Sequence, residues 1–222
     1  FMAMDAEWGL AMRLDSTYAY PWNMTLGAIK NNALIERTGK RIGMHRKQLG
    51  MTLNFDPDID INTNPDNPII GNRSFGEDKL NVAQKGLAFT RGMQSVGVLG
   101  SAKHFPGHGD TSKDSHKTLP TISFTANRLD EMELYPFRVL AKEVASVMIG
   151  HLNVPALEPK AGLPSSLSSV IITDLLKKKM GYEGLIFTDA LGMKGVSEYL
   201  PVGEVEVEAF LAGNDILLMP AN

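Results

Sequence analysis

Six short apolar runs recur along the chain of 222 residues, and each of them ends in polar or charged residues. The runs cover 1–7, 51–60, 98–105, 146–152, 184–191 and 214–220. The segments 80–97, 129–145, 168–181 and 203–213 lie between them and carry apolar residues at helical spacing. Strands that alternate with helices predict an α/β fold built on a parallel sheet.

The charged strand ends favour a barrel. In a (β/α)₈ or TIM barrel, the carboxyl ends of the strands form the rim where catalytic residues lie. A doubly wound open sheet binds ligands at the same edge and is the alternative, but the sequence has no glycine-rich nucleotide-binding motif. We expect one catalytic domain over 1–222, an incomplete TIM barrel of about six βα units. The pattern lacks about two units before its first strand and the helix after its last.

Composition excludes several classes of protein. The net charge is −3 and the basic residues are scattered, which argues against a nucleic-acid partner. No apolar run approaches the length of a membrane span. The absence of cysteine excludes disulfides and thiolate metal ligands within these residues. No export signal is recognisable at the first residues, and the oligomeric state cannot be predicted.

The densest chemical segment is K-H-F-P-G-H-G-D-T-S-K-D-S-H, residues 103–116, which holds three of the five histidines. A zinc site would use His104, His108 and His116, but proline and glycine between them break any helix, so the spacing fixes no ligand geometry. A phosphate-binding loop would leave the histidines unexplained, and its aspartates would repel the anion. We therefore predict no metal and no cofactor.

An acid/base loop explains the segment better. A carboxylate two residues before an imidazole, as in Asp114 and His116, can bind one ring nitrogen and leave the other to exchange a proton. Flanking glycines suggest that the loop can move. Asp189 ends the apolar run G-L-I-F-T-D, so a rigid strand would hold its carboxylate at the rim. An ionised carboxylate there suits a nucleophile that attacks an anomeric carbon.

The run G-S-A-K-H-F-P-G-H-G-D-T-S-K-D-S-H, residues 100–116, followed by L-P at 119–120, resembles the signature of glycoside hydrolase family 3, in its β-N-acetylglucosaminidase branch. The blocks L-N-F-D-P-D-I-D-I, I-I-G-N-R-S-F-G-E-D, G-L-I-F-T-D-A-L-G-M-K-G-V and A-G-N-D-I-L-L-M-P are similar to the other blocks of that family and come in its order. Together they cover nearly the whole chain. The resemblance implies a (β/α)₈ barrel that removes terminal β-linked N-acetylglucosamine with retention of configuration.

The resemblance also implies roles for single residues. Asp189 matches the nucleophile, His116 the acid/base, and Asp114 the partner of that histidine. The residues that match sugar-binding positions are Asp5, Arg73, Lys103 and His104. His108 has no such counterpart and is assigned to loop structure.

Two departures from the family bear on its substrate. The chain reads D-A-E-W-G-L where the family usually has D-Q-E-G-G-R, so that Trp8 replaces a glycine and Leu10 an arginine. Arg13 is a candidate to compensate for that arginine. Ala190 replaces a second acid after the nucleophile. A β-glucosidase or β-xylosidase of the same family, a non-catalytic sugar-binding barrel, a metal-dependent hydrolase, and phosphate as acceptor in place of water are the alternatives.

The expected substrates are peptidoglycan-derived or other cell-wall saccharides. That substrate class fits an exported or cell-envelope protein and also a cytoplasmic one. The deviant D-A-E-W-G-L block favours the exported form.

Overall fold

The computed structural model describes residues 2–112, 114–115, 117–201 and 203–220. Its centre is one sheet of five parallel strands in the spatial order β1-β2-β3-β4-β5. The strands are β1 (Ala3–Met4), β2 (Leu53–Asn54), β3 (Leu99–Phe105), β4 (Ser146–Ile149) and β5 (Leu185–Thr188). Spatial order follows chain order without reversal, which is the arrangement of a β/α barrel and not of a doubly wound sheet.

The sixth predicted run, 214–220, does not form a full strand among the described residues. Ile216 makes an isolated parallel bridge to Phe187. Next to it, the carboxylate of Asp215 accepts the N–H of Ile186 at 2.8 Å, a bond that a longer strand would make with a backbone carbonyl. The prediction of a parallel α/β sheet is confirmed, whereas the count of six βα units is not.

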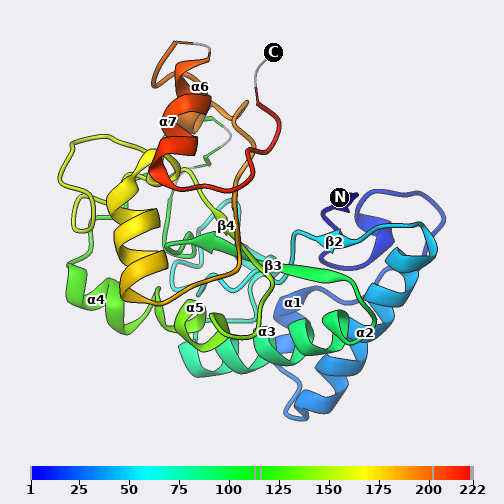
Figure 1. Cartoon of the computed structure of the whole chain (residues 1–222). Coiled ribbons are helices and arrows are strands. Elements are labelled where there is room, and N and C mark those ends of the chain that lie inside the picture. The colour runs from blue at the N-terminus through cyan, green and yellow to red at the C-terminus, as the bar shows by residue number, and fades with distance from the viewer. Residues whose placement is uncertain (1, 113, 116, 202, 221–222) are drawn as a thin grey trace.

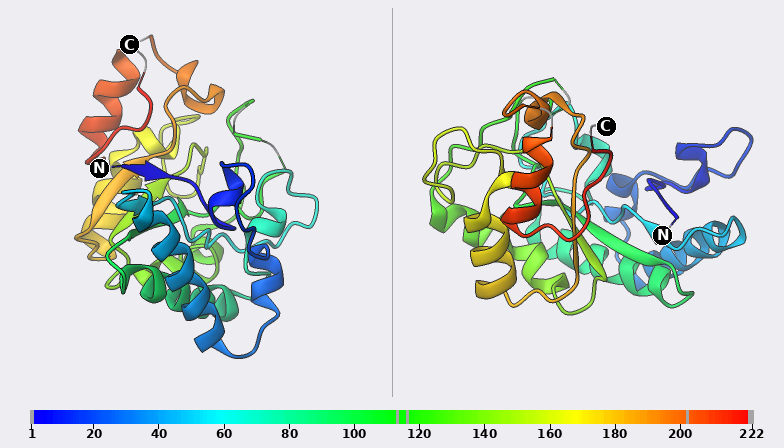
Figure 2. Two further views of the ribbon diagram at one scale, coloured as in Figure 1. Left: turned by 90° about the vertical axis from the view of Figure 1, so that its right-hand side faces the viewer. Right: turned by 45° about the horizontal axis from the view of Figure 1, so that its top comes forward.

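Helices surround the sheet (Figure 1). They are α1 (Asn23–Gly27), α2 (Asn32–Gln48), α3 (Lys79–Gln94), α4 (Ala126–Glu131), α5 (Tyr135–Leu140), the π-type helix η4 (Val170–Lys179), α6 (Lys194–Ser197) and α7 (Glu204–Ala212). Short 3₁₀ turns lie at Leu10–Met12, Gly71–Arg73 and Ser165–Leu167. Figure 2 shows that α2 and α3 run side by side, while α7 lies with the C-terminal part of the chain.

One predicted helix is in fact two. The segment 129–145 was expected to be continuous, but α4 ends at Glu131 and α5 starts at Tyr135. Pro136 stands in the first turn of α5, where proline starts a helix well and cannot continue an earlier one. At the start of η4 the Ser168 hydroxyl accepts the N–H of Ile171, and Gly181 follows the end of the helix with a φ of 67°.

The first two strands are tied together by one buried arginine. Arg46, near the end of α2, is fully buried and donates to the carbonyls of Met4 and Leu53 at 2.6 and 2.7 Å. These bonds join β1 to β2 at a point where each strand is only two residues long. No helix of the described residues is long and apolar enough to cross a membrane.

Candidate active site

The carboxyl ends of the strands surround a pocket of about 530 Å³. Five of the seven predicted site residues lie in its wall, and they are Asp5, Arg73, Lys103, His104 and Asp189, which follows β5. The predicted rim therefore exists, and residues up to 184 positions apart in the sequence share it.

Glu7 organises the cationic side of this pocket. It is buried and places one carboxylate oxygen 2.7 Å from the Lys103 ammonium and 2.8 Å from the Arg73 guanidinium. The same ammonium lies 2.9 Å from Asp5, whose other oxygen accepts from Arg13 at 2.8 Å. Arg13, the candidate to compensate for the missing family arginine, thus lies in the pocket wall.

Charge in this network holds its members ionised. Burial alone would raise the pKa of Glu7, but the nearby Lys103 and Arg73 cations lower it to about 2. The same opposition of burial and positive charge from Lys103 leaves the pKa of Asp5 below its usual range. Burial would lower the pKa of Lys103, and the Glu7 and Asp5 carboxylates raise it above the ordinary value. The pocket therefore offers fixed ammonium and guanidinium donors, which suit sugar hydroxyls.

His104 is oriented from behind by a buried carboxylate. Asp60 accepts from the His104 backbone N–H at 3.1 Å and lies 2.7 Å from its ring Nδ1. Burial would raise the pKa of Asp60, but the His104 side chain lowers it. A carboxylate at Nδ1 fixes the tautomer that carries its proton there, so Nε2 faces the pocket side, 3.4 Å from Arg73.

Asp60 is the last of three buried acids, Asp56, Asp58 and Asp60, that follow β2. The Asp56 carboxylate accepts the N–H of Asp58 at 2.9 Å, and the Asp58 carboxylate accepts the N–H of Asp60 at 3.1 Å. Burial raises the pKa of Asp56 to about 8, and burial together with the neighbouring Asp60 raises that of Asp58. These two bonds shape the chain behind the pocket, where the Asp58 carboxylate lies 3.5 Å from the Arg73 guanidinium.

Asp189 lies where its strand ends, half-buried in the pocket wall. Its N–H donates to the carbonyl of Ile149, and its own carboxylate accepts the N–H of Ala190 at 2.8 Å. Burial would raise the pKa of Asp189, but the His104 and His151 side chains lower it. His151 also contacts the Ala190 carbonyl at 3.0 Å, which fixes the chain just after the carboxylate. An ionised, immobile carboxylate is what a nucleophile requires.

The structure describes one member of the predicted acid/base pair. His116 lies outside the described residues, and Asp114 is half-buried. Ser115, between them, is buried in the pocket wall, and its hydroxyl lies 3.2 Å from Nε2 of His108. The segment that carries Asp114 thus reaches the pocket.

His108, assigned from the sequence only to loop structure, is bonded within its loop and also lines the pocket. Its Nδ1 lies 2.7 Å from the Thr111 hydroxyl, opposite the Ser115 contact. The glycines around it are packed against their surroundings, contrary to the idea that they let the loop move. A Cβ at Gly109 would lie 1.9 Å from the Ile61 carbonyl oxygen, and one at Gly107 would lie 2.7 Å from Glu133. These two positions require glycine because the chains approach closely.

Of the three histidines considered for zinc, His104 and His108 are among the described residues and His116 is not. The metal-capable group found there is Asp58, Asp60 and His104, with ligand atoms within 4.8 Å of one another. His108 is not a member of this group, and its ring nitrogens contact the hydroxyls of Ser115 and Thr111. Arg73 lies 3.5 Å from Asp58 and 3.4 Å from His104, so a guanidinium faces this group where a cation would bind.

From the sequence, Glu7 and Asp60 are recognisable as charged strand ends, but sequence reasoning gave neither of them a role in the site. A signal was present in the sequence, because each of them lies two positions after another acid near a strand end. Glu7 follows Asp5, and Asp60 follows Asp58. Alternation places such side chains on one face, but it does not reveal which cation they meet.

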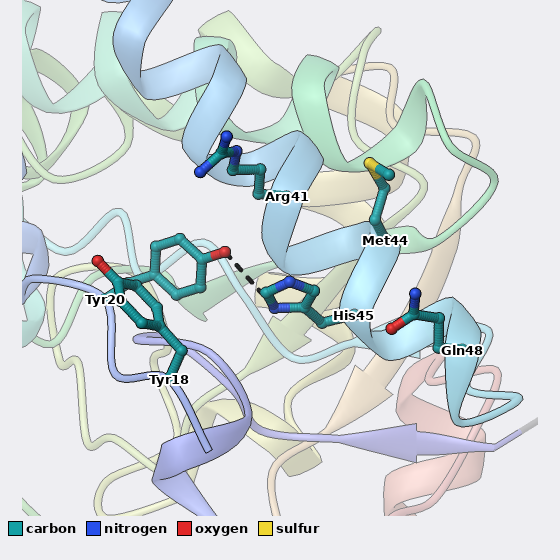
Figure 3. A pocket seen from close by; sticks show the side chains of 6 residues that line it. All are labelled: Tyr18, Tyr20, Arg41, Met44, His45 and Gln48. Atoms are coloured by element: carbon teal, nitrogen blue, oxygen red, sulfur yellow. Dashed lines mark hydrogen bonds between the residues drawn. The ribbon is translucent and has the colours of Figure 1, made fainter.

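A second hollow, of about 430 Å³, lies away from the strand ends (Figure 3). Tyr18 and Tyr20 face α2 there, opposite Arg41, Met44, His45 and Gln48. The Tyr20 hydroxyl and Nδ1 of His45 are 3.5 Å apart. No carboxylate of the described residues lines this hollow, which differs in this from the first pocket.

Comparison with known proteins decides the family. The model of the glycosyl hydrolase family 3 N-terminal domain matches residues 1–222. The chain belongs to this family. Beta-hexosaminidase A of Pseudoalteromonas piscicida is 36% identical over 99% of the chain, which covers 40% of that protein. Beta-hexosaminidase LpqI of Mycobacterium tuberculosis is 34% identical over 98% of the chain, which covers 57% of the relative.

A solved structure gives the same result. The family 3 β-N-acetylglucosaminidase from Paenibacillus sp. str. FPU-7 superposes with a TM-score of 0.93 and 44% identity. The match covers 97% of this chain and 41% of the other. The chain thus spans about half or less of the length of these relatives.

Proposed function

We propose that the family 3 protein to which this chain belongs is a retaining β-N-acetylglucosaminidase that acts on terminal β-linked N-acetylglucosamine. The observation that carries this proposal is the pocket itself, in which an ionised Asp189 faces fixed cationic donors. The hexosaminidases and the β-N-acetylglucosaminidase that resemble the chain support the choice of sugar. We place the substrates among peptidoglycan-derived or other cell-wall saccharides.

In the first step of the proposed mechanism, a carboxylate oxygen of Asp189 bonds to C1 of the sugar. The bond from C1 to the leaving oxygen breaks, and that oxygen takes a proton from His116, whose partner is Asp114. In the second step, His116 removes a proton from water, the resulting hydroxide bonds to C1, and Asp189 leaves as a carboxylate. Two inversions give retention of configuration.

The remaining site residues hold the sugar in this scheme. Lys103 and Asp5 form one donor and acceptor pair at the pocket wall, and Arg73 with His104 forms another. Charge-assisted hydrogen bonds to ring hydroxyls are strong and directional, so they favour one orientation of C1 towards Asp189.

The test is hydrolysis of an aryl β-N-acetylglucosaminide by the full-length protein and its Asp189→Ala and His116→Ala variants. We expect the aspartate variant to lose at least about 10³-fold in kcat. Unchanged turnover in Asp189→Ala would refute the assignment. Aryl β-glucoside and β-xyloside, assayed alongside, separate the sibling activities of the family, and added inorganic phosphate reveals any sugar 1-phosphate product.

A further inference from the structure

A shallow hollow of about 250 Å³ adjoins the candidate active site. Its lining includes Trp22, Asn67, Pro68, Ile69, Asn72 and Arg73. Pro68, Ile69 and Arg73 also line the catalytic pocket, so the two hollows share a wall. A substrate whose terminal sugar fills the pocket can therefore continue over this wall without leaving the protein surface.

Trp22 is held beside that wall by its neighbours. The side chain of Asn23 donates to the backbone carbonyl of Arg73 at 2.8 Å, which ties the start of α1 to the pocket. The ring of Trp22 lies against that of Trp8, with centroids 4.0 Å apart. Trp8 directly follows Glu7, the buried anchor of the pocket cations. The two tryptophans of these 222 residues thus both lie next to the candidate site.

The surface offered by Trp22 suits a neutral ring. Its side chain is 42% exposed although an indole gains considerably from burial. Among the described residues, Arg73 is the one charged residue that lines the hollow, and Glu7 already neutralises it. A flat apolar face with an amide at its edge, from the exposed Asn72, matches a pyranose, which has an apolar face and polar hydroxyls at its rim.

We propose that Trp22, backed by Trp8, is a binding platform for the sugar ring attached to the terminal residue, so that the protein prefers oligosaccharides over small glycosides. This inference rests on the proposed function and assigns it a specificity residue. Trp22 touches the leaving group only, and takes no part in the chemistry at C1.

The experiment compares two substrates of the full-length protein, N,N′-diacetylchitobiose and methyl β-N-acetylglucosaminide. For Trp22→Ala we expect kcat/KM on the disaccharide to fall about tenfold, with the methyl glycoside unchanged. Trp22→Phe keeps most of the activity on the disaccharide, since a ring remains. Tyr18→Ala, which removes a 67% exposed ring from the other hollow, serves as the control and changes neither value.

Equal losses on both substrates, or no loss on the disaccharide, would overturn the inference. If the unmodified protein cleaves neither substrate, the proposed function fails, and the platform fails with it. Far-UV circular dichroism and the thermal midpoint check the fold of each variant. If Trp22→Ala does not fold, Trp22→Phe decides the question. The change in tryptophan fluorescence on adding the disaccharide is measured for this variant and for the unmodified protein. Changes of equal size would contradict the platform.

Discussion

Glu7 is the residue through which the cations of the candidate site are held in place. Its single buried carboxylate serves both Lys103 and Arg73, which come from different segments of the chain. If it is removed, the buried Lys103 ammonium and the half-buried Arg73 guanidinium lose a shared counter-ion. The geometry of the pocket wall and the stability of the fold depend on the same contact.

We predict that Glu7→Gln lowers the free energy of unfolding by about 3 kcal/mol, because it breaks a buried ion pair by removing one partner. It should also reduce kcat/KM on the aryl substrate by at least about tenfold. Urea unfolding and steady-state kinetics measure the two effects. Glu143→Gln is the matched control, since Glu143 pairs with Arg91 at the surface, and we expect it to cost less than about 1 kcal/mol. Equal costs for the two variants would contradict the prediction.

His108 makes the fold sensitive to acid. Burial, and to a smaller extent the neighbouring His104, lowers the pKa of its imidazole to about 4. In the unfolded chain the same group takes up its proton near the ordinary value of 6.5. Between these two pH values the unfolded state binds more protons, so the stability from His108 is present above pH 6.5 and is lost as the pH falls towards 4.

We predict that the stability advantage of the unmodified protein over His108→Asn shrinks by about 3 kcal/mol between pH 7 and pH 4. Urea unfolding of both proteins at pH 7, 5.5 and 4 measures this difference, in which the other titrating groups largely cancel. A difference that stays constant over this range would show that His108 is not the group responsible.

At the scale of elements, the contact between α2 and α3 depends on glycine. A Cβ at Gly92 would lie 1.9 Å from the Glu36 carbonyl oxygen, and one at Gly39 would lie 2.3 Å from that of Phe89. Each helix thus presents a glycine to the backbone of the other. Gly39, with many polar residues, weakens the apolar pattern of α2, the longest described helix, which was not predicted from the sequence.

We predict that Gly92→Ala destabilises the protein by at least about 2 kcal/mol, because the two helices must move apart to admit one methyl group. The control is Gly192→Ala, where an added Cβ has no atom within 4 Å. Denaturant midpoints of the two variants measure the effect. Similar midpoints would mean that the helices adjust without cost.

At the scale of the whole molecule, the candidate site joins parts that are remote in sequence. Asp5 and Lys103, 98 positions apart, form one of its ion pairs, and Asp189 comes from a third strand. A ligand that binds all three regions binds the folded state alone. Its binding must therefore raise the stability of the fold as a unit.

We predict that N-acetylglucosamine at ten times its Kd stabilises the full-length protein by about 1.4 kcal/mol. The Lys103→Met variant should show no such gain at that sugar concentration, because the ammonium that would hold a hydroxyl is absent. Thermal midpoints with and without sugar measure both, and xylose serves as a control sugar. A gain of the same size in Lys103→Met would place the sugar elsewhere.

By itself, the sequence determined the class of fold and, through its motifs, the family. It also placed Asp5 and Asp189 directly after apolar runs, because such runs and the residues after them are local signals. Only the tertiary structure revealed that Glu7 joins Lys103 to Arg73, that Asp60 orients His104, and that Trp22 lies beside the pocket. Those contacts join residues 14 to 96 positions apart. Periodicity records which face of an element is buried, but the partner across the interior is chosen by the packing of the whole chain.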